Sequence, residues 1–294
     1  MSDVLTVVSC SIDPDQVDCL FELLDADRFT PTSWYDLEKK ICRVDVFLED
    51  AGEAPAVCSA LIDAGRLIGL ELKPGCSTMA RSDWAESWKR FFHVEKISEH
   101  VVVRPSWEPY TPKPGEVVIR LDPGMSFGTG KHATTQACLR FLDRLAGEDR
   151  TRSVIDMGCG SGILAIGAKL LGFPDVAAFD NDPDCLHVTL ENAAFNGVSF
   201  PVTVDDLSHP YPPRDIVVAN ILAPVLITFA PQVAASVARK PGARLILSGI
   251  LDEQYPAVRD AYAAQGMREV DTILIEEWRS GLFRPDPAEG RSGE

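Results

Sequence analysis

From about residue 100 onward, short apolar runs alternate with stretches that repeat apolar residues every three to four positions. The short runs predict buried strands at 151–156, 177–180, 201–204, 215–219 and 243–248. The longer stretches between them predict helices at 135–145, 163–171, 224–239 and 252–265. Residues 268–277 and 279–284 predict a closing antiparallel pair of strands. This alternation is typical of an α/β domain with a seven-stranded, Rossmann-like sheet over residues 99–284.

The first hundred residues follow a different order. Strand-like runs at 5–8, 33–37, 41–48 and 67–72 enclose helical patterns at 13–24 and 55–64. The order βαββαβ predicts a small ferredoxin-like α+β domain over residues 1–78. Residues 79–98 predict a linker helix, in which Trp84, Trp88 and Phe91 share one face. Residues 285–294 are polar and predict a disordered tail.

Composition and charge narrow the class of protein. The 294 residues carry a net charge of −16, which argues against sequence-independent phosphate binding, so no nucleic-acid partner is expected. No apolar run approaches about 18 residues, so no membrane span is expected. The chain begins without a signal-peptide pattern. The eight cysteines contain no Cys-x-x-Cys, which predicts a cytoplasmic protein without a metal site.

Candidate chemistry begins with a glycine-rich turn after the first strand of the larger domain. Asp156 lies two residues before the first of three glycines, Gly158, Gly160 and Gly162, and Asp180 ends the next strand. A glycine turn at a helix N-terminus lets a ligand approach bare backbone, and an acid after the second strand can accept hydrogen bonds from a ribose diol. A dinucleotide-binding fingerprint requires Gly-x-Gly-x-x-Gly, and here the spacing differs. The pattern resembles motif one of the S-adenosylmethionine-dependent methyltransferases.

Two further segments flank this turn. Residues 122–135 are rich in glycine and small polar side chains and predict a lid over the cofactor, with Thr134 or Thr135 capping the next helix. Asn220 ends the strand at 215–219, at the sheet edge where open α/β sheets bind ligands. It is either a helix N-cap or the acceptor of hydrogen bonds from a target amine. Asp205 or Asp206 is expected to receive the adenine amino group, and the spacing does not choose between them.

Together these residues carry a family resemblance. The segment Phe-Gly-Thr-Gly-x-His-x-Thr-Thr at 127–135, the glycine turn, Asp-x-Asp-Pro at 180–183 and Asn-Ile-Leu-Ala at 220–223 resemble the PrmA family. These enzymes are bacterial ribosomal protein L11 methyltransferases that modify the stalk base of the large subunit. The resemblance covers about residues 83–278 and implies a class I methyltransferase domain behind a substrate-recognition domain.

The resemblance also implies the reaction and the site. It implies methylation of lysine side chains and an α-amino group by S-adenosylmethionine, in a monomeric enzyme. Asn220 would be catalytic. The cofactor would be contacted by Thr135, Gly158, Gly160, Asp180 and Asn220 and covered by Phe127, Gly128 and His132. Lys131 departs from the residues that are usual at its position; it either helps to hold the methionyl carboxylate or faces solvent, and solvent is the favoured alternative.

Two other functions remain open at this point. One is lysine methylation of a different protein, against which the small first domain argues. The other is a non-catalytic scaffold that binds an adenosyl group and holds a partner on its acidic first domain. Asn220 at the strand end argues against the scaffold.

Overall fold

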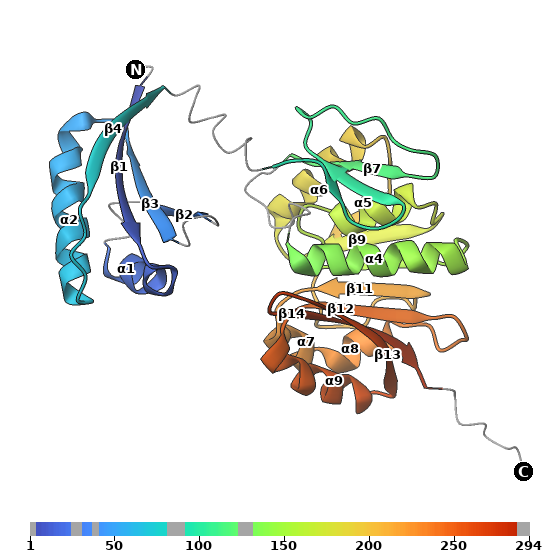
Figure 1. The fold of residues 1–294 in the computed structure, drawn as a ribbon. Helices are drawn as coiled ribbons and strands as arrows, with labels where there is room; N and C mark the ends of the chain where they lie inside the picture. The colour runs from blue at the N-terminus through green and yellow to red at the C-terminus, as the bar shows by residue number, and fades with distance from the viewer. Residues whose placement is uncertain (1–3, 25–30, 37–40, 81–91, 123–131, 287–294) are drawn as a thin grey trace, which may run out of the picture. The chain divides into compact units, whose positions relative to one another are not determined.

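The computed structural model describes residues 4–24, 31–36, 41–80, 92–122 and 132–286. The chain divides into two compact units, residues 1–91 and residues 92–294 (Figure 1). Most of the predicted lid, most of the predicted tail and residues 81–91 of the predicted linker helix lie outside the described residues. The helix prediction was wrong at both ends of the linker, because residues 79–80 end one strand and residues 95–96 form another. No helix in the described part of the chain is both long and apolar enough to cross a membrane.

The small unit is a four-stranded antiparallel sheet covered by two helices. Alternate residues of the central strand are buried, and Val8 lies opposite Val46. Val8, Leu20 and Leu61 are fully buried in the core between sheet and helices. The strand order β2-β3-β1-β4 is that of a ferredoxin-like unit, as predicted. The elements are β1 (Val4–Ile12), α1 (Val17–Leu23), β2 (Pro31–Asp36), β3 (Ile41–Leu48), α2 (Ala54–Leu67) and β4 (Gly75–Ala80).

The prediction of a strand at residues 67–72 was wrong. Leu67 is the last residue of α2, and Leu72 turns back into the core after a short loop. The fourth strand is β4, which pairs with β1 through contacts such as Val8 opposite Cys76. Most side chains of β4 are exposed, so the strand has no apolar alternation that could have predicted it.

The larger unit is built on a seven-stranded sheet in the order β10-β9-β8-β11-β12-β14-β13 (Figure 1). β14 runs antiparallel to both of its neighbours, and the other paired strands are parallel. This order confirms the predicted class I methyltransferase architecture. The strands are β8 (Val154–Met157), β9 (Val176–Asp180), β10 (Val202–Val204), β11 (Ile216–Asn220), β12 (Arg244–Leu251), β13 (Met267–Ile275) and β14 (Trp278–Pro285).

Helices cover both faces of this sheet, because successive residues of each strand point to opposite sides. Val154, Ile216 and Ile246 face one core, and Ile155 and Val217 face the other. The first core is covered by α4 (Ala133–Glu148), α5 (Ile163–Leu170) and α6 (Pro183–Phe195). The second is covered by α7 (Ala223–Thr228), α8 (Ala230–Ala235) and α9 (Tyr255–Ala263). The central strands β8, β9, β11 and β12 are largely apolar because both of their faces are buried.

Three short strands precede the main sheet, and one predicted helix is divided. β5 (Glu95–Lys96), β6 (Val101–Arg104) and β7 (Val117–Arg120) form a small sheet that joins the first core. The helix predicted at 224–239 is two helices, α7 and α8, which meet at Phe229. Pro231 lies in the first turn of α8, where its missing N–H costs nothing, and it could not continue α7.

Candidate active site

A cavity of about 700 Å³ lies at the carboxyl ends of the parallel strands, where open α/β sheets bind ligands. The residues that follow β8, β9, β10 and β11 all contribute to its wall. Its lining residues are His132, Thr134, Gly158, Phe179, Asn181, Asp205, Asp206, Leu207, Asn220, Ile221, Leu222, Val225, Phe229, Gly249 and Trp278.

The glycine turn forms the floor of this cavity. Gly158 has a φ of 75°, and its N–H donates to the Phe179 carbonyl at 2.9 Å, which ties the turn to β9. A Cβ atom on Gly158 would lie 2.6 Å from the Cγ2 of Ile221. Only glycine therefore fits between the first strand and the segment after β11, and its bare backbone faces the cavity.

Asp180 is an anchored carboxylate at the end of β9. Its Oδ2 accepts from the Gly160 N–H at 2.8 Å, and its Oδ1 accepts from the Asp182 N–H at 3.0 Å. The residue is 9% exposed. Two backbone donors fix the position of the carboxylate, and each oxygen keeps a lone pair that could accept a ribose hydroxyl.

Asp156 lies beneath the turn and does not reach the cavity wall. It is 1% exposed, and its Oδ2 accepts from the Ala165 N–H in the first turn of α5 at 3.2 Å. Burial is the main cause that raises the pKa of Asp156 to about 7; the hydrogen bond from Ala165 opposes this shift and the nearby charge of Asp180 adds to it. Asp156 therefore links the end of β8 to the first turn of α5, across the glycine turn.

His132 caps α4, and the prediction that Thr134 or Thr135 would be the cap was wrong. His132 has extended backbone angles, and its Nδ1 lies 2.7 Å from the Oγ1 of Thr134 and accepts from the Thr134 N–H. Both threonines are inside the helix and fully buried. The two buried hydroxyls point inward, so the imidazole is the side chain at the free end of the helix.

The imidazole of His132 also forms part of the cavity wall. Its ring meets the ring of Trp278 edge-on, with 4.8 Å between the centroids. Burial lowers the pKa of His132, and the carboxylates of Glu277 and Glu276 oppose this shift. The ring is therefore neutral at neutral pH.

Asn220 is the last residue of β11 and lines the cavity. Its Oδ1 is buried and has no hydrogen-bond partner among the described residues. The N-cap of α7 is Leu222, so the alternative that Asn220 caps this helix is wrong. A buried acceptor without a partner is costly unless a ligand supplies the donor.

On the side of the cavity next to β10, Asp205 and Asp206 both contribute to the lining. The Asp205 N–H donates to the Asp180 carbonyl at 3.0 Å, which brings this loop beside β9. Hydrogen bonds from Ser208 lower the pKa of Asp206. Both carboxylates are accessible to a ligand, so the choice between them for an adenine amino group stays open.

The structure distributes the predicted site residues in three groups. His132, Gly158 and Asn220 line the cavity. A second group lies next to the cavity and consists of Thr135, Gly160 and Asp180. The Gly160 N–H donates to the carboxylate of Asp180. The Oγ1 of Thr135 is buried and has no partner in the described chain. The third group lies outside the described residues and consists of Phe127, Gly128 and Lys131.

Sequence reasoning missed the wall opposite the glycine turn. This wall comes from α7 and from the hairpin of β13 and β14, and includes Leu222, Val225, Phe229 and Trp278. Leu222 is 67% exposed, although its neighbours in sequence are buried or half-buried. The two apolar residues that follow Asn220 were the one available signal in the sequence, and the exposure of Leu222 is visible only in the structure. Trp278 belongs to a strand pair at the sheet edge, and its sequence context predicts nothing about a ligand.

This arrangement can hold two groups side by side. The glycine turn, Asp180 and the Asp205–Asp206 loop offer backbone donors and carboxylates that suit an adenosyl group. Asn220 offers an oxygen acceptor next to apolar side chains, which suits a neutral amine. The buried acceptor of Asn220 and the close fit around Gly158 are the structural signs that the site accommodates such ligands.

Comparison with known proteins gives a consistent result. Residues 20–284 match the family model described as ribosomal protein L11 methyltransferase (PrmA). The ribosomal protein L11 methyltransferase of Geobacter metallireducens is 39% identical over 256 residues, which cover 87% of this chain and 80% of that protein. The same-named protein of Syntrophotalea carbinolica is 44% identical over 217 residues, covering 71% of this chain and 69% of its own length.

A solved structure agrees with these matches. The crystal structure of the ribosomal protein L11 methylase from Lactobacillus delbrueckii subsp. bulgaricus is 32% identical and superposes with a TM-score of 0.57. The match covers 67% of this chain and 99% of that one. The predicted methyltransferase family, and with it the S-adenosylmethionine cofactor, is confirmed by these findings. The chain belongs to the ribosomal protein L11 methyltransferase (PrmA) family.

Proposed function

We propose that this protein methylates amino groups of ribosomal protein L11 at the stalk base of the large subunit, on lysine side chains, the N-terminal amine or both. S-adenosylmethionine is the methyl donor. The observation that carries the proposal is the buried, unpartnered Oδ1 of Asn220 beside the glycine turn. An amine that enters the cavity supplies the donor that this oxygen lacks.

The donor is held by the end of the site nearest the glycine turn. Asp180 would accept the ribose hydroxyls, and the backbone of Gly158 and Gly160 would hold the adenosyl group. The N-terminus of α4, with Thr135 in its first turn, would hold the methionyl carboxylate, because free N–H groups and the helix dipole favour an anion there. When bound, the cofactor supplies a methyl group on a positively charged sulfur.

The acceptor is held by the opposite end. The Oδ1 of Asn220 would accept a hydrogen bond from the target amine and so fix the direction of the nitrogen lone pair. Leu222, Val225 and Phe229 would exclude water from the bound amine. An apolar surrounding lowers the pKa of an ammonium group, so the lysine would release its proton to solvent water as it enters the site and would react as the neutral amine. Alignment and desolvation provide the acceleration, without a dedicated base.

The small ferredoxin-like unit is proposed to recognise the protein substrate. Every described residue that lines the cavity falls between His132 and Trp278, so the small unit contributes no described residue to the cavity. Its surface is therefore available to bind the protein substrate. We place residues 1–78 in this domain, residues 79–98 in the linker and residues 99–284 in the catalytic domain, with the reaction in the cytoplasm. A monomeric enzyme stays a prediction.

The proposal is tested with radiolabelled S-adenosylmethionine and purified, unmethylated L11. We expect label on L11 with the parent enzyme, and about a hundredfold lower kcat with Asn220→Ala, because a misaligned acceptor loses factors of this size. Binding of S-adenosylhomocysteine, measured by calorimetry, is the control and should change less than threefold, about 0.65 kcal/mol.

Each contrary outcome identifies a different error. Label on another protein from a cell extract, with none on L11, would indicate a different lysine methyltransferase. Cofactor binding without transfer to any protein would indicate a scaffold. If Asn220→Ala is as active as the parent, Asn220 is not the residue that orients the amine.

A further inference from the structure

Three arginines lie side by side at the end of the main sheet opposite the cavity. Arg268 of β13 is the direct cross-strand partner of Arg284 of β14. On the other side of β14, Phe283 pairs with Leu245, so Arg244 and Arg284 are the next residues along that ladder. Neighbouring strands are about 4.8 Å apart. Arg244, Arg284 and Arg268 therefore form a continuous row, here called the arginine row.

Three adjacent arginines repel one another, so the row destabilises the fold unless an anion binds to it. Like charges directly opposite one another in a sheet destabilise it. Among the described residues, the carboxylate that pairs with the row is Asp286, which is 3.8 Å from Arg268 in an exposed pair. Arg284 makes no hydrogen bond or ion pair in the part of the chain that is described, and the side-chain bond of Arg244 goes to the carbonyl of its own neighbour, Ala243.

A pocket of about 400 Å³ opens beside the row and adds two more cations. The guanidinium of Arg239 donates to the carbonyls of Gln265 and Gly266, each at 3.0 Å, which fixes its position. Lys240 is 59% exposed while it pairs with Asp215. The pocket is lined by Arg239, Lys240, Pro241, Gly242, Ala243, Arg244, Arg284, Pro285 and Asp286, which together carry four positive charges and one negative charge.

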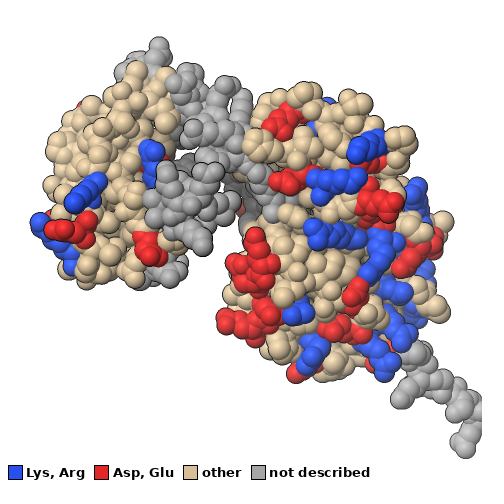
Figure 2. Space-filling model, viewed as in Figure 1, with Lys and Arg blue, Asp and Glu red and all other residues tan. Residues whose placement is uncertain are grey.

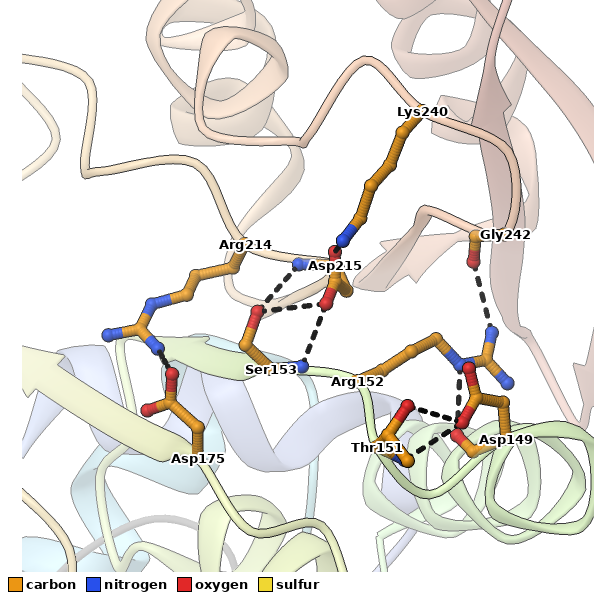
Figure 3. Close-up of polar contacts among 9 residues, drawn as sticks. All are labelled: Asp149, Thr151, Arg152, Ser153, Asp175, Arg214, Asp215, Lys240 and Gly242. Atoms are coloured by element: carbon orange, nitrogen blue, oxygen red, sulfur yellow. Dashed lines mark hydrogen bonds and ion pairs between the residues drawn. The ribbon is translucent and has the colours of Figure 1, made fainter.

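Other cations near this edge are already committed to the fold (Figure 3). Arg152 is 6% exposed and donates to the carbonyls of Asp149 and Gly242, each at 3.0 Å. Arg214 is paired with Asp175. Asp215 is held by the Ser153 N–H and hydroxyl as well as by Lys240. These contacts join the amino ends of the strands. The cations of this edge that a ligand can reach are then the arginine row and the cations that line the pocket.

The overall negative charge does not cancel this local field. Lys and Arg side chains gather on the right-hand side of the larger unit in Figure 2. Exposed charges farther away than a Debye length, about 8 Å at physiological salt, are largely screened. The net charge of −16 therefore predicts little about a ligand that touches only this edge.

We propose that the arginine row, with Arg239 and Lys240, is a second binding site that takes successive phosphates of an RNA strand. The chemistry recognised is the phosphodiester backbone, because guanidinium groups pair with phosphate through two hydrogen bonds. The pocket lining contains no aromatic ring on which a base could stack, so binding is independent of base sequence. That the polyanion is RNA rests on the proposed function, since a ribosomal protein accompanies RNA.

The test is fluorescence anisotropy with a labelled single-stranded RNA of about 12 nucleotides, titrated at several salt concentrations. We expect Arg244→Gln/Arg268→Gln/Arg284→Gln to bind at least tenfold more weakly than the parent. Its slope of log K against log salt should be shallower by about 2, because each lost phosphate contact contributes about 0.7 on a single strand. Arg259→Gln, which removes an exposed arginine of α9 paired with Asp260, is the matched control and should bind as the parent does.

Further measurements separate this proposal from the proposed function. The triple variant should methylate free L11 at the parent rate and should melt no lower than the parent in phosphate-free buffer, because repulsion within the row is relieved. A DNA strand that binds as tightly as RNA supports backbone recognition. A parent enzyme that methylates L11 and binds inorganic phosphate but no RNA overturns the proposal, as does a folded triple variant with parental RNA affinity.

Discussion

Three oxygen atoms on single residues carry much of the chemistry of this site. Asn220 Oδ1, Thr135 Oγ1 and Asp156 Oδ1 are all buried and lack hydrogen-bond partners in the described structure. Buried acceptors are nearly always paired, so the unpaired oxygen of Asn220, the one of the three that lines the cavity, indicates a place for a ligand donor. Asn220 lines the cavity, and Asp156, beneath the glycine turn, is the one whose pKa is shifted to about 7.

The pKa of Asp156 makes stability depend on pH. The folded-state pKa of about 7 is above the unfolded value of about 3.9, so the folded state binds the extra proton. This contribution is fully present below about pH 4 and is lost as the pH rises through 7. We expect Asp156→Asn, which cannot ionise, to gain stability relative to the parent across that window, by an amount on the order of 4 kcal/mol.

Urea unfolding of both proteins at pH 5 and pH 8 measures this difference, with circular dichroism as the probe. Comparing the two proteins at each pH removes the contribution of all other titrating groups. A difference in unfolding free energy that is the same at both pH values would show that Asp156 does not titrate near neutrality.

At the scale of elements, the position of Asn220 depends on the strand beside it. Asn220 pairs with Ser248 on β12, and the next residue, Ile221, donates its N–H to the Ser248 carbonyl at 3.2 Å. The register of β12 with β14 shifts between Leu247 and Ile250, and Gly249 lies in this bulge with a φ of 81°. Bulges redirect side chains and occur next to active sites.

Gly249→Ala should therefore damage catalysis more than folding. The added Cβ would overlap the carbonyl oxygen of Ile221, so the segment that carries Asn220 must move. We expect kcat to fall at least tenfold and the free energy of unfolding to fall by about 1–3 kcal/mol. Methyl transfer kinetics and urea unfolding give the two values.

The matched control is Gly147→Ala on α4. A Cβ atom there meets nothing within 4 Å, and the position is helical. Alanine should raise stability by roughly 0.5–1 kcal/mol and leave kcat unchanged. Parental activity in Gly249→Ala would show that the bulge does not position the acceptor.

At the scale of the whole molecule, the two units have separate cores. The core of residues 4–80 shares no residue with the two cores of the larger unit. The cavity is lined within the larger unit alone, as far as the described residues show. Whether the small unit recognises the substrate while the larger unit catalyses the reaction can therefore be tested by separating the two units.

A fragment of residues 92–294 should fold and bind S-adenosylhomocysteine as the full chain does, because its cores are complete. Its KM for L11 should rise at least tenfold, which corresponds to about 1.4 kcal/mol of lost recognition. Circular dichroism, calorimetry and transfer kinetics measure the three properties. A fragment with the KM of the full chain would remove the recognition role from the small unit, and a fragment that binds no cofactor would show that the units are interdependent.

Local chemistry made the two sheets and the cofactor end of the site predictable. The central strands of the larger unit are largely apolar because both of their faces are buried, and the glycine turn needs positive φ at Gly158 and Gly162. Such requirements act on neighbouring residues and leave a pattern in the sequence. The alternation of strands and helices along the chain and the ferredoxin-like unit followed from the same patterns, whereas the class I architecture was implied by the family resemblance. Two features could not be predicted in this way. The strand β4 is mostly exposed and so has no apolar alternation. The division into α7 and α8 occurs inside one apolar stretch and is marked only by a proline.

Only the tertiary structure decided which distant residues share a site. Trp278 reaches His132 across 146 positions, and Gly249 makes room for Ile221. The arginine row exists only because the register of three strands brings Arg244, Arg284 and Arg268 together. By itself the sequence determined which segments form helices, strands and turns, because side-chain periodicity and the allowed backbone angles act within each segment. Which segments meet depends on strand pairing and packing over long separations, which leave no local signal in the chain.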